Sequence, residues 1–263
     1  MSLIEALLLG LLQGFTEFLP VSSSGHLLLG KLLLGIESQG VAFEIAVHAA
    51  TVLSILTVFR KEISRLLKSC ITVKYNEDTR YILQILISMA PVLVAGLFLK
   101  KQIEMVFGDG LVMVGAMLLV TALLLIVSQL IPSKDLPFKY RDAFIMGLAQ
   151  AAALLPGLSR SGATISTGLL LGKERTTVVR FSFLMVIIPV LGQAFLDVVK
   201  GGFAPEASGI SLISLLAGFT AAYLSGLAAC SWMVALVKKA KLWGFAVYCA
   251  FVGAFCLFLF FAG

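Results

Sequence analysis

Two short polar stretches interrupt an otherwise apolar sequence, and both carry side chains capable of chemistry. The first, GFTEFLPVSSSGH (14–26), places a carboxylate, three hydroxyls and an imidazole within ten positions. The second, LPGLSRSGATIS (155–166), adds further hydroxyls and the guanidinium of Arg160. Because hydrocarbon strongly disfavours such groups, their presence among apolar segments predicts a functional site.

The first stretch is predicted to form two half-helices around a break. Gln13 and Glu17 are four residues apart, so their side chains share one face of a helix. Pro20 is expected to end that helix, and His26 falls in the first turn or so of the next one. Three successive hydroxyls are suited to cap this second helix: Ser22, Ser23 and Ser24.

The second stretch repeats this pattern. Pro156 and Gly157 predict a break, and Arg160 lies at the start of a helix that Ser159 or Ser161 can cap. Two helix N-termini that converge would form an anion site, because each presents free N–H groups and a positive dipole end. A guanidinium adds a bidentate donor suited to phosphate oxygens. A buried carboxylate beside such an anion is expected to be protonated, to hold a metal ion or to handle a proton.

These groups together favour a phosphate-ester or diphosphate hydrolase. Hydrolysis needs a nucleophile, a proton carrier and charge neutralisation, which hydroxyl, imidazole and guanidinium groups can supply. Within lipid, the substrate would carry its own hydrocarbon tail. A phosphate-lipid flippase or an ion-coupled secondary transporter is the main alternative, because a midplane anion site between broken helices also suits transport. A noncatalytic scaffold would leave the paired polar stretches without a purpose.

The rest of the sequence predicts an all-α polytopic membrane protein that forms a single domain over residues 1–263. Of the 263 residues, 60% are hydrophobic and 13% are charged, about half the charge of a typical soluble domain. Four cysteines without C-x-x-C spacing predict neither disulfides nor zinc, and no removable signal peptide is expected. Six apolar segments are long enough to be transmembrane helices: 43–59, 81–99, 111–131, 181–199, 211–236 and 242–262.

Two other apolar segments, 3–35 and 142–172, are broken near their middles, and we expect each to form a re-entrant helical hairpin. A shift of 137 residues aligns them without a gap, with ten identities over positions 10–35. The aligned polar and small residues include Gln13 with Gln150, Ser22 with Ser159, Ser24 with Ser161 and Gly25 with Gly162. Three spans separate the copies, so the sequence predicts inverted-topology repeats of about 1–131 and 138–263 whose tips meet near the midplane.

The net charge of +6 is explained by membrane topology, and no nucleic-acid partner is expected. Fifteen of the 20 Lys and Arg residues lie in four clusters, within 60–80, 134–141, 173–180 and 238–241. The positive-inside rule assigns these clusters to cytoplasmic loops. The outer segments are then 36–42, 100–110 and 200–210, so the first hairpin would enter from the outer face.

The two polar stretches closely resemble the bacitracin-resistance family of undecaprenyl-diphosphate phosphatases. That family carries a Glu/Gln-x-x-x-Glu motif, a following Ser-Ser-Ser-Gly-His and a distal P-G-x-S-R-S-G-x-T. The three motifs stand here at 13–17, 22–26 and 156–164. Segments 43–60 and 180–190 are also similar to family sequence, so the resemblance covers essentially the whole chain.

The resemblance implies hydrolysis of a membrane lipid, undecaprenyl diphosphate, to undecaprenyl phosphate and inorganic phosphate. It implies a bacterial plasma-membrane enzyme whose site opens to the outer, periplasmic side. The reaction would recycle the lipid carrier of peptidoglycan synthesis and confer bacitracin resistance. A divalent cation, Mg²⁺ or Ca²⁺, is implied as cofactor. The choice between a monomer and a homodimer stays open.

The catalytic residues that the resemblance implies are Glu17, Ser23, His26 and Arg160. Glu17 would hold the metal or carry a proton, and His26 would transfer protons. Ser23 would attack phosphorus or contact phosphate, with activated water as the open alternative. Gln13 is the family's neutral option, which weakens any scheme with two carboxylates on the metal. The expected substrate-binding residues are Gln13, Ser22, Ser24, Gly25, Ser159, Ser161, Gly162 and Thr164.

Further expectations concern the surroundings of the site. His26 Nε2 and the Arg160 guanidinium should lie within about 10 Å of each other if both bind one phosphate at hydrogen-bond lengths. His48 is expected to be a satisfied interior polar group. The Phe-rich segment 245–261 is expected to face lipid.

Overall fold

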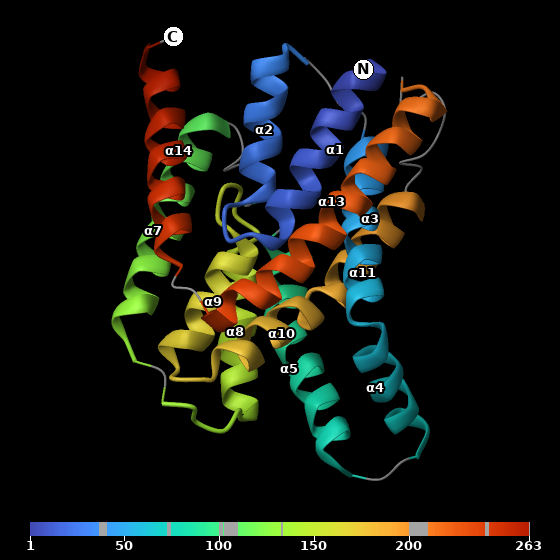
Figure 1. Ribbon diagram of the computed structural model, residues 1–263, viewed down its shortest axis with the longest axis vertical. Helices are drawn as coiled ribbons and strands as arrows, with labels where there is room; N and C mark the ends of the chain where they lie inside the picture. Colours follow the sequence, from blue (N-terminus) through green and yellow to red (C-terminus); the bar gives the residue numbers. More distant parts are fainter. Residues whose placement is uncertain are drawn as a thin grey trace.

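The computed structural model of the chain describes residues 1–36, 41–72, 75–99, 102, 110–132, 134–199, 210–239 and 242–262. The regular elements within these ranges are helices, with no strands among them (Figure 1), so the predicted all-α class is confirmed. The outer segments predicted at 36–42, 100–110 and 200–210 lie largely outside the described residues.

Several helices are long and apolar enough to cross a membrane, which makes the chain a multi-pass membrane protein. Within the described ranges there are five such stretches: Glu77–Phe98 (α5), Gly110–Leu130 (α7), Arg175–Leu196 (α10, Arg175–Met185, with α11, Ile187–Val199), Leu212–Val237 (in α13, Leu212–Lys239) and Trp243–Ala262 (α14). A sixth is added if α3 (Val41–Val58) and α4 (Arg60–Thr72), which are bent by 79° at their junction, count as one span.

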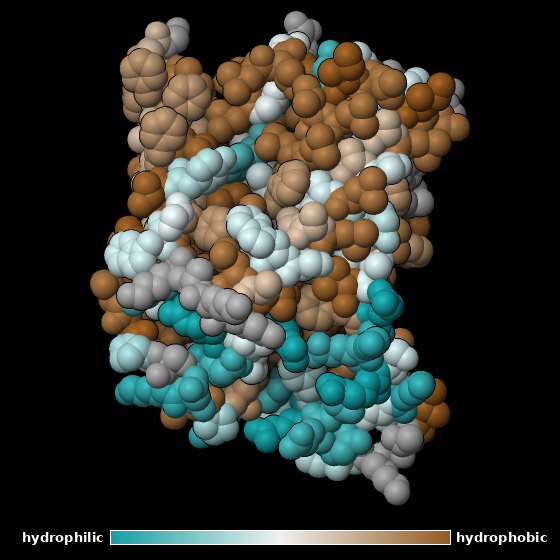
Figure 2. Space-filling view, viewed as in Figure 1, coloured by the Kyte–Doolittle hydropathy of each residue, from teal (hydrophilic) through white to brown (hydrophobic). Residues whose placement is uncertain are grey.

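The surface divides into an apolar part and a hydrophilic end. Figure 2 shows apolar side chains over the upper part of one face and hydrophilic residues gathered at the lower end, where α4 and the start of α5 lie. The prediction that the basic cluster within 60–80 lies in a loop is wrong in part, because residues 60–72 form α4. Leu66 in α4 is buried while Arg60 and Lys61 are exposed; this amphipathic alternation favours a surface helix.

Each polar stretch lies between two helices, as predicted. The first hairpin contains α1 (Leu3–Phe18) and α2 (Ser23–Leu34), and the second contains α8 (Tyr140–Ala152) and α9 (Arg160–Leu170). The helix α1 ends because Pro20 forces the preceding residue, Leu19, into an extended conformation with ψ 145°. Ser22 caps α2 by accepting from the Gly25 N–H, and Ser159 caps α9 by accepting from the Gly162 N–H.

The hairpins are enclosed by the long helices. The helix α1 packs on α13, α8 packs on α5, and α7 packs on α14. Where α7 crosses α14, a Cβ on Gly115 would lie 2.9 Å from Gly253 O, and a Cβ on Gly253 would lie 2.9 Å from Gly115 O. This close and reciprocal approach places the backbones of the two helices against each other beside the tips.

Candidate active site

Glu17, in the last turn of α1, is held by two side chains of its own hairpin. Gln13 Nε2 donates a 3.0 Å hydrogen bond to Glu17 Oε2, as expected for residues four apart on one helical face. Ser23 Oγ, at the first position of α2, donates to the same oxygen over 2.6 Å. A hydrogen bond this short is typical of a hydroxyl donating to a carboxylate.

Arg160, at the first position of α9, joins this group from the second hairpin. Its Nη1 lies 3.3 Å from Glu17 Oε1, and the Glu17 side chain is only 11% exposed. One carboxylate oxygen therefore accepts from Ser23 and Gln13, and the other forms an ion pair across the hairpins. A poorly hydrated ion pair of this kind is costly to break on one side, because the remaining charge would be left unpaired.

Backbone groups complete the contact between the tips. Ser161 Oγ donates to Leu19 O over 2.9 Å, and the Gly157 N–H donates to Ser24 Oγ over 3.4 Å. The expectation that the two polar tips meet is confirmed by these contacts and by the Glu17–Arg160 pair.

His26 is buried, and both of its ring nitrogens have partners. Nδ1 lies 2.8 Å from Ser22 O, and Nε2 lies 2.7 Å from the hydroxyl of Tyr248 in α14. Neither partner belongs to the group around Glu17. The expected approach of His26 Nε2 to Arg160 within about 10 Å stays a prediction, and the group that accepts from the Ser23 hydroxyl is Glu17.

The other expected substrate-binding residues have partners within the protein. Ser22 Oγ and Ser24 Oγ lie 3.3 Å apart, and so do Ser159 Oγ and Ser161 Oγ. Thr164 Oγ1 lies 2.8 Å from Arg160 O and 2.6 Å from the hydroxyl of Ser182. The cap bonds already use the N–H groups of Gly25 and Gly162. These contacts hold the tips together, and a role in binding substrate stays a prediction for each of these residues.

Two glutamines at equivalent repeat positions carry polar atoms without partners. Gln13 Oε1 has no hydrogen-bond partner among the described residues, and neither does the side-chain amide of Gln150. Both side chains are almost fully buried. A buried polar atom without a partner is costly, so Gln13 Oε1, beside Glu17, is suited to a ligand that brings a cation or a hydrogen-bond donor.

Two residues near the site were not predicted to belong to it. Tyr248 lies in the segment expected to face lipid, and nothing in its local sequence separates it from the neighbouring aromatic residues. His48, expected to be an interior polar group, has Nδ1 2.8 Å from Glu44 O and interacts electrostatically with Glu17. Both residues lie near the tips because of how α3 and α14 pack around them, and no local sequence pattern predicts that packing.

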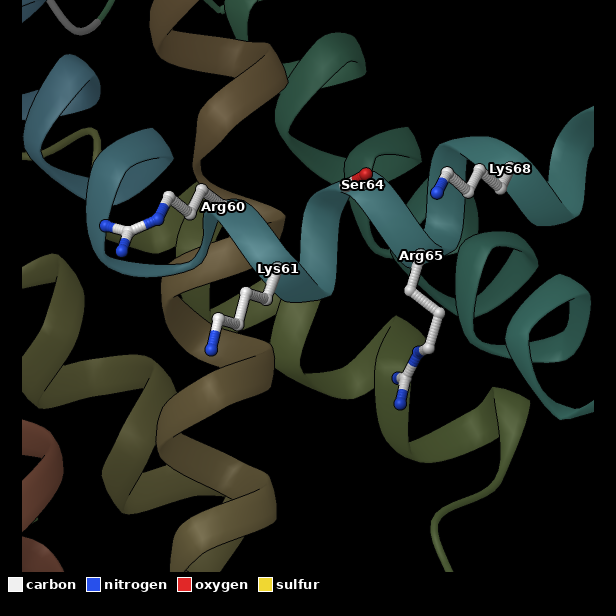
Figure 3. Close-up of a pocket in the computed structure, with 5 residues that line it drawn as sticks. All are labelled: Arg60, Lys61, Ser64, Arg65 and Lys68. Carbon is white, nitrogen blue, oxygen red and sulfur yellow. The ribbon is translucent and has the colours of Figure 1, made fainter.

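A concave region of about 480 Å³ lies on α4, and Figure 3 shows its lining residues as Arg60, Lys61, Ser64, Arg65 and Lys68. Their side chains are exposed, and Arg65 Nε forms a 3.1 Å ion pair with Asp78. The lining includes no carboxylate or imidazole. It therefore offers cations for a membrane surface but no nucleophile–base pair.

The fold and these contacts define a class: a multi-pass membrane protein with a carboxylate, a hydroxyl and a guanidinium joined where two helical hairpins touch. The family model described as "Bacitracin resistance protein BacA" matches residues 6–255. The chain belongs to this family, as its motifs indicated.

Curated relatives are similar in sequence over nearly the whole chain. The undecaprenyl-diphosphatase of Parabacteroides distasonis is 52% identical over 256 residues, which cover 96% of each chain. The undecaprenyl-diphosphatase of Bacteroides fragilis is 52% identical over 258 residues, again 96% of each. That of Salinibacter ruber is 38% identical over 268 residues, covering 97% of this chain and 98% of the relative.

Proposed function

We propose that this chain hydrolyses undecaprenyl diphosphate to undecaprenyl phosphate and inorganic phosphate. The observation that carries the proposal is the contact of Ser23, Glu17 and Arg160 where the two hairpins meet. Membership of the family and the names of the relatives support the same activity. The names of those relatives give no support to a transporter.

Arg160 is the residue proposed to bind the diphosphate. In the structure its charge is balanced by Glu17, and a diphosphate would offer the guanidinium a more highly charged, bidentate acceptor. When Arg160 turns to the substrate, Glu17 is left with its bonds from Ser23 and Gln13. This exchange of partners would couple substrate binding to the activation of the hydroxyl.

Ser23 Oγ is the proposed nucleophile, because its proton already points to a carboxylate. Attack on the terminal phosphorus forms a bond from Ser23 Oγ to phosphorus, passes the hydroxyl proton to Glu17 and breaks the bond to undecaprenyl phosphate, which leaves. Water then cleaves the phosphoserine, which yields inorganic phosphate and restores the hydroxyl. Direct attack by water is the competing route, and it forms no phosphoenzyme.

A divalent cation, Mg²⁺ or Ca²⁺, fits the oxygen atoms beside the ion pair. These ions prefer oxygen ligands, and Mg²⁺ commonly takes one or two carboxylates and completes its shell with substrate phosphates and water. Glu17 and the unpartnered Gln13 Oε1 would hold it. Within the described ranges no group of three or more His, Cys, Asp or Glu residues could hold a metal, so the substrate would supply further ligands. When bound, the ion would offset the negative charge of the phosphates.

The membrane arrangement proposed is six transmembrane helices and two re-entrant hairpins in a single domain built from inverted repeats. The equivalent caps formed by Ser22 and Ser159 support it. The location proposed is the bacterial plasma membrane, with the site open to the outer side. This orientation rests on the distribution of basic residues in the sequence.

The test is phosphate release from undecaprenyl diphosphate by the purified protein in detergent, with Mg²⁺, with Ca²⁺ and with a chelator. We expect release by the wild type, loss of release in Ser23→Ala and Arg160→Ala, and full release in Arg60→Ala, a control on the exposed face of α4. A wild type that releases no more phosphate than Arg160→Ala with any of the ions would contradict the proposal.

A further inference from the structure

Tyr248 differs from the other aromatic residues of α14. Phe251, Phe258 and Phe261 are 72%, 65% and 78% exposed, as expected for side chains that face lipid. Tyr248 is also partly exposed, but its hydroxyl is bonded to His26 Nε2 at 2.7 Å. The two rings are nearly parallel, with an interplanar angle of 12° and centroids 5.5 Å apart. The outer surface of α14 therefore connects directly to a predicted catalytic residue.

The hydrogen bonds of His26 define which nitrogen carries its proton. Ser22 O is a carbonyl oxygen and can only accept, so Nδ1 is the donor in the bond to it. In the neutral imidazole the other nitrogen then has a lone pair, so the Tyr248 hydroxyl donates to Nε2. His26 is thereby held as the Nδ1–H tautomer in a fixed orientation.

This arrangement places the phenol at the only basic atom of His26. A lone pair on an aromatic nitrogen accepts one strong hydrogen bond, and the Tyr248 hydroxyl occupies it. A proton can reach Nε2 either through this hydroxyl or after its displacement. Because a hydroxyl both donates and accepts, Tyr248 can donate to the neutral ring and accept from the protonated ring without moving away.

A neighbouring residue ties the same helix to the same tip. Cys249 Sγ lies 3.3 Å from Pro20 O, in the break between α1 and α2. The helix α14 is otherwise packed along α7, at the side of the hairpin in Figure 1. Two successive residues of α14 thus contact the first hairpin, Cys249 at its break and Tyr248 at α2.

We propose that Tyr248 is a positioning residue for His26 and that its hydroxyl is the route by which Nε2 gains and loses a proton. As water attacks the phosphorus of the phosphoserine, the bond from the water oxygen to phosphorus forms and the bond from phosphorus to Ser23 Oγ breaks. One proton of the water passes to the phenol oxygen while the phenol's own proton moves to Nε2, and Ser23 Oγ takes back the proton held by Glu17. Tyr248 ends neutral and His26 ends as the cation. The proposal rests on the phosphatase function proposed above, which supplies the attacking water.

The first test uses nitrogen NMR of protein labelled with ¹⁵N-histidine, because the chain has only two histidines. His48 also has a carbonyl oxygen near Nδ1, and its Nε2 has no hydrogen-bond partner among the described residues, so it is an internal reference. In Tyr248→Phe we expect the His26 Nε2 resonance to move toward that of an unpartnered nitrogen while the His48 resonances stay in place. Unchanged His26 resonances would overturn the proposal.

The second test measures phosphate release by Tyr248→Phe, with Tyr223→Phe as the matched control. Tyr223 also lies in a spanning helix, and its hydroxyl is 3.2 Å from Thr57 Oγ1 rather than bonded to a histidine. We expect kcat to fall about tenfold to a hundredfold in Tyr248→Phe, with KM little changed because the substitution removes a proton route and leaves Arg160 in place to bind the phosphates. We expect no comparable fall in Tyr223→Phe.

Each other outcome counts against the proposal. A moved resonance with unchanged kcat would show that the bond exists without a role in turnover. Equal losses in both Tyr→Phe variants would indicate a general effect of removing a hydroxyl. A wild type without phosphate release fails the proposed function itself, which is distinct from an active wild type with an equally active Tyr248→Phe variant, where only the role of Tyr248 fails.

Discussion

The two hairpins use one backbone plan to deliver different chemistry to a single carboxylate. Ser23 and Arg160 are counterparts under the shift of 137 residues, and each is the first residue of the second helix in its hairpin. Ser23 donates to Glu17 Oε2, and Arg160 pairs with Glu17 Oε1. Equivalent positions thus hold the proposed nucleophile on one side and the proposed phosphate-binding cation on the other.

Two further positions, which hold the carboxylate and the imidazole in the first hairpin, have diverged. The counterpart of Glu17 is Leu154, and that of His26 is Ala163. The tips also differ in length, because residues 19–22 join α1 to α2 whereas residues 153–159 join α8 to α9. The comparison teaches that the scaffold is duplicated but the chemistry is divided, so neither hairpin holds a complete set of groups.

If the chemistry is divided in this way, Glu17 and Arg160 should behave as one unit. We expect Glu17→Gln and Arg160→Gln each to lower kcat/KM about 10²-fold to 10³-fold, the typical cost of losing a group that stabilises the transition state. Groups that act together are strongly non-additive, so the double variant should lose no more than the worse single variant. Phosphate-release kinetics on the four proteins of the cycle measure the coupling.

A matched cycle on Lys173 and Asp142 provides the control, since this ion pair, 2.7 Å long, lies in the second hairpin region but away from the tips. We expect its variants to change stability far more than kcat/KM. Additive losses for Glu17 and Arg160 would mean that the two side chains act separately, and the division of chemistry between the hairpins would not hold.

The breaks and caps of both hairpins could be predicted because they depend on local chemistry. Pro20 fixes the backbone around itself whatever surrounds it, and a serine before a helix satisfies a free N–H by a contact within three residues. The same shift of 137 residues that aligned these signals also indicated that the two polar tips would meet, since it paired two hairpins of opposite orientation.

The contact of His26 with Tyr248 depended on information that short stretches of sequence do not carry. Tyr248 reaches His26 from 222 residues away, and its place on α14 follows from how α14 packs on α7. Residues 60–72 read as a loop because their basic residues dominate the composition, although Leu66 and its neighbours give the segment one apolar face. Long-range packing decided the contact of His26, whereas the helix at 60–72 follows from the local spacing of its apolar residues.

Because the scaffold is duplicated, we expect a Gly→Ala substitution to cost equal stability at Gly10 and Gly147, which are counterparts in α1 and α8. A Cβ on Gly10 would lie 2.3 Å from Gly218 O, and a Cβ on Gly147 would lie 2.3 Å from Ser88 O. Because neither carbonyl belongs to a flexible side chain, we expect each Gly→Ala variant to lose about 1–3 kcal/mol of stability. Thermal unfolding in detergent measures the loss.

Gly96, in α5, is the control, because a Cβ there meets nothing within 4 Å. Gly96→Ala should be neutral or stabilising by up to about 1 kcal/mol, through the higher helix propensity of alanine. A large loss at Gly10 with none at Gly147 would show that the two hairpins pack by different rules despite their aligned sequences.

The smallest expected effect separates the two caps. Ser22→Ala and Ser159→Ala should each cost about 1 kcal/mol, because each removes the acceptor for an N–H of the first turn. The backbone differs, however: Ser22 has φ 70°, in the left-handed region, whereas Ser159 has φ −67°. Glycine is free of the steric cost that a side chain meets at positive φ, about 1 kcal/mol, so replacing alanine by glycine should recover more stability at position 22 than at position 159. Unfolding midpoints of the four variants decide this, and an equal gain at both positions would mean that the left-handed turn at Ser22 is not a feature of the first hairpin in solution.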